Sequence, residues 1–202
     1  MTRQLLSLAI TLPSGIEPET AVHIAQMAGR LGFSAIHLSS ADFTSQLVER
    51  LVDAAASALV VVDLPHETDG IVHVNDPAAV AQARAEMDES DATRPLLVAV
   101  PISIGRTMSE AVARADLEAR FAGDRHPRDV GIFGTFEQAQ DQVLALARAG
   151  ADGLIVDVPF VRDIADVLAQ IRALVVGATP ELVNATTRRS VPAPRTVFYG
   201  GE

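Results

Sequence analysis

The sequence predicts an α/β protein built on a reduced (β/α) TIM-like barrel, in which helices surround parallel strands. Continuous apolar runs recur along the chain, and segments with the period of amphipathic helices separate them. Similar small-residue joints connect the end of a helix to the next strand. An open doubly wound sheet is the alternative. The repetition of similar units favours the barrel, but a full eight-stranded barrel takes about 250 residues. The chain has only 202 residues, so we expect an incomplete one.

Four apolar runs each end at a proline, and they cover residues 6–13, 58–65, 96–101 and 153–159. An unbroken run of Val, Ile and Leu, rather than an alternating one, indicates a strand buried on both faces, as in parallel sheets. We expect each proline to stand where its strand gives way to a loop, because no ladder N–H is needed there. A fifth strand is expected over 34–40, and GIFG at 131–134 supplies a short sixth.

The segments between these runs have helical period and recognisable caps. Asp76 is placed to cap one helix, and Thr107 begins an S/T-x-x-E capping box. The expected helices cover 17–33, 43–56, 76–90, 107–121, 135–149 and 163–175. We assign residues 1–183 to the barrel domain. Residues 184–202 have no period and are rich in Pro, Thr and Arg, so we expect an extended C-terminal arm.

Composition excludes several classes of function. The formal net charge of −10 argues against a nucleic-acid partner, which needs a cationic surface. All 16 basic residues are Arg, so Schiff-base lysine chemistry and the phosphate-binding lysine of a P-loop are excluded. There is no Cys, which excludes disulfides and thiolate catalysis. No apolar window reaches the length of a membrane span, so we expect a cytoplasmic protein without a membrane partner.

Ligands of parallel α/β folds bind at the carboxyl ends of the strands. That rule selects Thr11, Ser39, Ser40, Asp42, Asp63, His66, Glu67, Ser103, Gly134, Thr135 and Asp157. The densest polar cluster is Asp63, His66 and Glu67, which reads either as a metal or acid–base site or as a solvated loop. His37 reads either as a residue of the barrel mouth or as a hydrogen-bonded core histidine. The hydrolase, zincin, Rossmann and P-loop motifs are absent.

The stretch GTFEQAQDQVLALARAGADGLIVDVP, residues 134–159, opens either with a phosphate-binding turn or with an ordinary helix cap. Its opening Gly134-Thr135 could present a helix N-terminus to a phosphate. Thr135 and Gln138 could instead form a capping box. Glu137 lies in the first turn, where it favours the helix dipole and would repel an anion. Local physics therefore favours the cap.

The same stretch resembles the luciferase-like flavin monooxygenase family, through its similarity to G-T-P-E-x-[VL]-A-x-x-L…A-G-[VA]-D-G-[FL]. VRDIADVLAQIRALV is similar to the helix that follows in that family. RPLLVAVPISIGRTMSEAVARADLEAR resembles its penultimate strand and T-x-x-E-A-x-x-R helix, and TAVHIAQMAGRLGFSAIHLSS resembles its opening. Two departures stand out. Phe136 replaces the usual Pro, and the family's long central region is missing between about residues 64 and 95.

The resemblance implies a (β/α) barrel that uses FMN or a deazaflavin and commonly forms a homodimer. It implies cofactor contacts from Ser39, Asp63 and Ser103, with Gly134 and Thr135 at the start of the helix expected over 135–149, and it leaves the catalytic residues unknown. The leading hypothesis is a flavin-dependent monooxygenase that acts on a small organic substrate with reduced flavin, supplied by a partner flavin reductase, and O2. The alternative is a non-catalytic barrel that acts as a flavin-binding or partner subunit. A third hypothesis is a metal-assisted lyase or isomerase using Asp63, His66 and Asp157.

Overall fold

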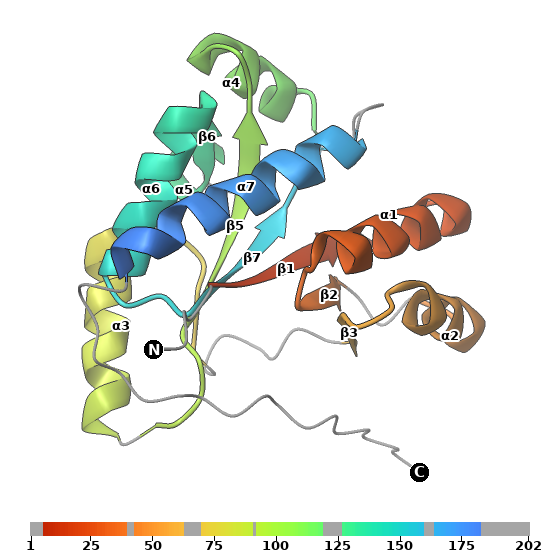
Figure 1. The fold of residues 1–202 in the computed structure, drawn as a ribbon, viewed down its shortest axis with the longest axis horizontal. Helices are drawn as coiled ribbons and strands as arrows, with labels where there is room; N and C mark the ends of the chain where they lie inside the picture. The colour runs from red at the N-terminus through yellow and green to blue at the C-terminus, as the bar shows by residue number, and fades with distance from the viewer. Residues whose placement is uncertain are drawn as a thin grey trace.

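The computed structural model describes residues 6–39, 43–62, 70–90, 92–118, 127–159 and 164–182. They form a seven-stranded parallel sheet with helices around it (Figure 1). The strands are β1 (Ser7–Leu12), β2 (Ala35–Leu38), β3 (Leu59–Val62), β4 (Ile71–Val72), β5 (Leu97–Ile104), β6 (Ile132–Gly134) and β7 (Gly153–Asp157). The helices are α1 (Pro18–Leu31), α2 (Ser45–Ala54), α3 (Pro77–Glu89), α4 (Met108–Asp116), α5 (Pro127–Val130), α6 (Phe136–Arg148) and α7 (Ile164–Leu182).

The sheet is an open, incomplete barrel. Its strand order is β3-β2-β1-β7-β5-β4, and every neighbouring pair is parallel. Strands β3 and β4 form the two edges, and the described residues show no pairing between them. This confirms the predicted fold class and all six predicted strands. The sequence missed β4 because a strand of two residues leaves no periodic signal.

Strands β4 and β6 share one edge of β5. The Leu97 N–H donates to Gly70 O, and the Gly105 N–H donates to Gly134 O. Backbone N–H groups an even number of residues apart in a strand point the same way, so both partners lie on the same side.

The prediction that each proline ends its strand is wrong for Pro101, which lies inside β5. It stands between the two pairings, Leu97–Val98 with β4 and Ile102–Ile104 with β6, where a missing N–H breaks no ladder bond.

The two faces of the sheet are built differently. The outer face packs against the helices in the main core, with Ile10 and Ile36 fully buried. The inner face carries a second, smaller cluster of Ala9, Ala35 and Ile155, and half-buried apolar side chains of β3, β4 and β5 adjoin it. The open edge between β3 and β4 explains why those side chains are only half covered.

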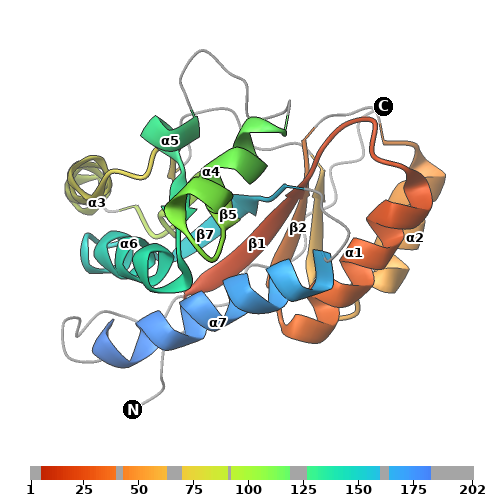
Figure 2. The ribbon, with the colours of Figure 1, turned by 90° about the horizontal axis from the view of Figure 1, so that it is seen from above.

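Helix α4 lies on the inner side of β5 and β6, away from the other helices that follow strands. Its Ala115 packs on Phe133, and the Ser103 hydroxyl donates to the Ala111 carbonyl of α4 at 2.9 Å. Figure 2 shows α4 and α5 on the side of the sheet opposite α6 and α7. The connection from β5 to β6 runs toward the sheet edge, whereas that from β6 to β7 runs back past β5. Right-handed crossovers in opposite directions place their helices on opposite faces.

The predicted caps at Asp76 and Thr107 are observed, because Asp76 accepts from the Ala78 N–H at 2.9 Å and Thr107 accepts from the Glu110 N–H at 3.1 Å. Helix α1 is followed by Gly32 with φ of 76°, a left-handed C-cap. The predicted arm, residues 184–202, lies outside the described residues.

Candidate functional site

A polar row crosses the inner face near the carboxyl ends of the central strands. The register pairs Thr11 of β1 with His37 of β2, and His37 with Val61 of β3. On the other side, β1 and β7 are paired up to Ile10↔Val156, so Asp157 follows beside Thr11 at the end of the ladder. A hydroxyl, an imidazole and a carboxylate therefore stand on adjacent strands at the edge where ligands of such folds bind.

His37 is the most unusual residue of this row. It is 7% exposed, and its Nδ1 has no hydrogen-bond partner among the described residues. Burial lowers its pKa from 6.5 to about 4, so the imidazole is neutral at pH 7. Leaving a buried polar atom without a partner costs about 1–3 kcal/mol, and proteins retain few such atoms. A ligand that reached the Nδ1 atom would supply the hydrogen bond that it lacks among the described residues.

Below the polar row the inner face is flat and apolar. Ala9, Ala35 and Ala99 lie in one register line with Ile155 and Leu59. Alanine side chains project little from a sheet, and in this floor Ala9, Ala35 and Ile155 are buried while Leu59 and Ala99 are half-buried.

Ser39 extends β2 beyond His37 and holds the loop that follows β1. Its N–H donates to Leu12 O at 3.0 Å, and its Oγ accepts from the Ser14 N–H at 2.9 Å. The exposed side chain of Ser39 therefore fixes the loop between β1 and α1 at the rim of the sheet.

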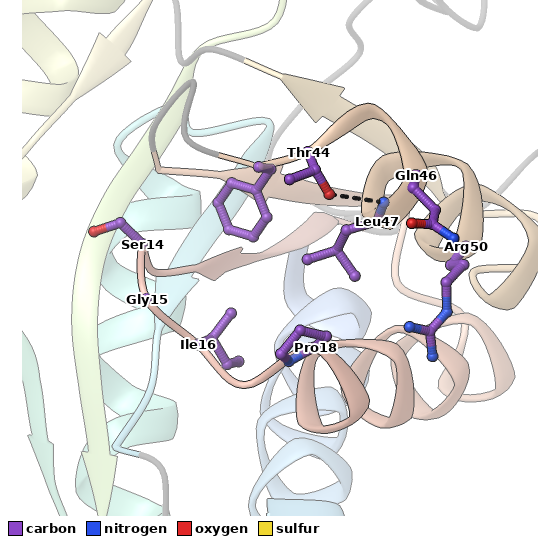
Figure 3. A pocket seen from close by; sticks show the side chains of 9 residues that line it. Ser14, Gly15, Ile16, Pro18, Thr44, Gln46, Leu47 and Arg50 are labelled. Carbon is purple, nitrogen blue, oxygen red and sulfur yellow. Dashed lines mark hydrogen bonds between the residues drawn. The ribbon is translucent and has the colours of Figure 1, made fainter.

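That loop forms one wall of a pocket with a volume of about 330 Å³. The pocket lies between the β1–α1 loop and α2, and Figure 3 shows Ile16, Pro18 and Leu47 around it with Gln46 and Arg50 at one end. Its full lining is Ser14, Gly15, Ile16, Pro18, Phe43, Thr44, Gln46, Leu47 and Arg50. The pocket is separate from the polar row, because no residue of that row lines it.

The structure places Ser103 at a different depth from Ser39. Its side chain is 1% exposed beneath α4, and its hydroxyl donates to that helix. Ser103 therefore fixes α4 on the inner side of the sheet. Its predicted contact with a cofactor is not tested by this arrangement.

Gly134 and Thr135 form the cap that local physics favours. The Thr135 Oγ accepts from the Gln138 N–H at 3.4 Å, and the Thr135 N–H donates to the Gln138 side chain at 3.0 Å. Hydrogen bonds from its own backbone N–H and from the Thr135 hydroxyl hold the pKa of the Glu137 carboxyl below its usual range. The α6 N-terminus already holds an anionic group of the chain itself. A role for these residues toward a cofactor stays a prediction.

Several predicted positions lie outside the described residues, namely Ser40, Asp42, Asp63, His66 and Glu67. Within the described ranges, no group of three or more His, Asp or Glu side chains is placed to hold a metal ion. The helices of those ranges include none with the length and apolarity needed to cross a membrane.

Sequence reasoning found Thr11, His37 and Asp157 as separate candidates but not the row that joins them. It also missed the pocket. The signal for the pocket was the spacing of Gln46, Leu47 and Arg50, which lie on one side of α2 at helical period although two of them are polar, with Phe43 just before the helix.

Together these features define a class of protein, a parallel β/α barrel-like fold with a polar site at the carboxyl ends of its strands. No protein-family model matches the chain, and no curated protein matches it. Among solved structures it is similar to the coenzyme F420-dependent tetrahydromethanopterin reductase of Methanopyrus kandleri, with a TM-score of 0.59 and 11% identity over 87% of this chain and 99% of that one. It is also similar to apo-MsnO8, with a TM-score of 0.50 and 13% identity over 91% and 100% of the two chains. At these identities the likeness establishes the fold.

Proposed function

We propose that this protein is a luciferase-like oxidoreductase that binds a deazaflavin or FMN on the inner face of its sheet and acts on a small organic substrate. The observation that carries the proposal is the buried Nδ1 of His37, which has no partner among the described residues and lies on the same face of the sheet as the alanine floor. The fold likeness to an F420-dependent reductase supports the cofactor class. The sequence resemblance to luciferase-like barrels supports it independently.

We expect the planar heterocycle of the cofactor to bind against the inner face. The alanine floor offers apolar contact to the face of a ring, and the polar row offers hydrogen bonds to one ring edge. The neutral imidazole of His37 can donate or accept, according to its tautomer, and Thr11 beside it carries a hydroxyl that can do either. Helix α4 closes the inner side over β5 and β6, so it shields one end of the site from water. A bound flavin or deazaflavin supplies hydride chemistry that no side chain of this protein provides.

Binding to the ligand-free protein tests this proposal directly. We expect coenzyme F420 or FMN to bind with a saturable change in its fluorescence, and His37→Phe to weaken binding by about tenfold or more. His23→Phe is the matched control, because His23 is exposed on α1, and it is expected to leave binding unchanged. Absence of binding of both cofactors at millimolar concentration would sink the proposal. Equal cofactor affinity of the His37→Phe and His23→Phe variants would show that the cofactor does not bind at the inner face.

The homodimer and the partner flavin reductase implied by the resemblance belong to the same proposal. A sedimentation experiment is expected to give twice the monomer mass of 21.3 kDa. If FMN is the cofactor, turnover with O2 is expected to require a reductase that supplies reduced flavin. Turnover with F420 in the absence of a flavin reductase would show that no such reductase is required.

A further inference from the structure

The pocket between the β1–α1 loop and α2 has the construction of a binding site for a small molecule. Its walls are apolar, with Ile16 and Pro18 on the loop side and Phe43 and Leu47 on the α2 side. Its volume of about 330 Å³ lies at the lower end of the range for ligand pockets. Such a volume suits a short apolar body rather than a full cofactor.

Two polar residues of the pocket, Gln46 and Arg50, lie at one end of it on successive turns of α2, whereas Ser14 lies on the opposite side (Figure 3). Gln46 contributes an amide, and Arg50 contributes a guanidinium whose Nη2 donates to Glu19 Oε1 at 2.7 Å. A guanidinium has five N–H donors, so this bond leaves others for a ligand. The end of the pocket is therefore rich in donors, and an acceptor oxygen is the group that it suits.

Charge around Arg50 decides between a neutral ligand and an anion. Glu19 already pairs with Arg50, at side-chain exposures of 72% and 41%. Hydrogen bonds from the hydroxyl and N–H of Thr20 hold the pKa of the Glu17 carboxyl below its usual range, and the charge of Arg50 contributes to that effect. Two acidic residues therefore stand near one guanidinium, one of them in direct contact with it, and the formal charge of the three groups is negative. An anionic ligand would be repelled and would also lose its hydration.

We infer that this pocket binds a small uncharged molecule with an apolar body and one acceptor oxygen, such as a ketone or an ester. The apolar body would lie between Ile16 and Leu47, and the oxygen would accept a hydrogen bond at the Gln46 and Arg50 end. The inference stands apart from the cofactor proposal, because the pocket is formed without any residue of the polar row. A failure of cofactor binding would leave it intact.

Three probes of one chain length test the inference on the ligand-free full chain. 2-Heptanone, heptanoate and heptylammonium are titrated at pH 7.5 while the methyl NMR signals of Ile16 and Leu47 are followed. We expect saturable shifts of these signals with 2-heptanone and binding about tenfold weaker or worse for both ions. Tighter binding of heptanoate would make Arg50 an anion site, and tighter binding of heptylammonium would make the rim a cation site. Either result, or no saturable shift with any probe, overturns the inference.

Matched variants locate the binding. Leu47→Ala is expected to weaken 2-heptanone binding about tenfold, because it removes apolar contact area from the wall. Val52→Ala on the same helix is the control, since Val52 is 50% exposed and does not line the pocket, and it should leave the affinity unchanged. Arg50→Gln keeps a donor without the charge and should retain binding within about twofold. Equal weakening by Leu47→Ala and Val52→Ala would place the probe elsewhere.

Discussion

The guanidinium of Arg84 on α3 pairs with the carboxylate of Asp152, immediately before β7. Its Nε also donates to the Gly150 carbonyl at 3.0 Å, and the same Asp152 carboxylate accepts from the Leu96 N–H at 2.9 Å. The Asp of the A-G-A-D-G sequence thus joins α3, β5 and β7 at the amino ends of the strands. Residues at that end of a barrel serve stability rather than catalysis.

Removing this carboxylate should destabilise the protein without affecting ligands. The side chains of Arg84 and Asp152 are only 14% and 29% exposed, so loss of one partner leaves a poorly solvated charge. We expect Asp152→Ala to lower the free energy of unfolding by about 2–3 kcal/mol in urea. The control is Glu19→Gln at the exposed pair with Arg50, which should change it by about 0.5 kcal/mol or less. A loss at Asp152 no larger than the control would contradict this assignment.

We expect the N-terminal cap of α6 to contribute to the stability of the fold rather than to ligand binding. Thr135→Ala removes the acceptor for the Gln138 N–H and should cost about 1 kcal/mol, whereas Thr135→Ser should be nearly neutral. Gly134→Ala should cost more, because Gly134 has φ of 145° and an added Cβ would lie 2.6 Å from Gln138 Oε1. Thermal unfolding measures these effects. If Thr135→Ala instead weakened FMN or F420 binding tenfold with no change in stability, the phosphate role would be correct.

Stability should depend on pH through His37. Its folded pKa of about 4 lies below the unfolded value of 6.5, so the unfolded chain binds the extra proton between these values. The stabilisation is complete above pH 6.5 and is lost as the pH falls toward 4, by about 3 kcal/mol. In the register Thr11 and Val61 flank His37 without charge, and the carboxylate of Asp157 stands one strand further away.

His37→Phe isolates that contribution. The difference in unfolding free energy between wild type and variant should change by about 3 kcal/mol between pH 7 and pH 4. At pH 7 the variant should be as stable as wild type or more so, since it removes a buried atom that lacks a partner among the described residues. His23→Phe serves again as the control. A variant that unfolds more easily at pH 7 would show that His37 has a structural role instead.

Helices α1 and α2 touch at Gly29. A Cβ added there would lie 2.3 Å from the backbone oxygen of Ala55, which cannot move without shifting the end of α2. Gly29→Ala should therefore destabilise the protein by about 1–2 kcal/mol, despite the better helix propensity of Ala. Gln26→Ala, at an exposed position of the same helix, should be neutral or stabilising. Urea unfolding of both variants checks this, and a gain at Gly29 would disprove the close contact.

Much of the fold was predictable because its signals are local. The unbroken Val, Ile and Leu runs predicted buried parallel strands, and β1, β2, β3, β5, β6 and β7 form where they were expected. Thr135 and Gln138 predicted their own capping box, since the bonds of a cap join residues three positions apart. Even the choice between phosphate turn and cap followed from Glu137, which lies in the same helical turn.

The candidate site was not predictable to the same extent. Thr11 and His37 are 26 residues apart in the sequence and meet only through the register of β1 and β2. The isolation of the His37 Nδ1 depends on everything packed around it, and no sequence pattern records that environment. The same holds for the pocket, because Ile16 comes from the β1–α1 loop and Leu47 from α2, which are far apart in the sequence.

The sequence by itself determined the strand and helix units, their caps, and the exclusion of lysine and cysteine chemistry. The tertiary structure alone decided that α4 crosses to the inner side of the sheet, that Pro101 lies within β5, and that His37 shares the inner face with an alanine floor. The physical reason is that propensity and capping act within a few residues of the chain. Register and crossover handedness relate segments far apart in it, and they determine which side chains share a site.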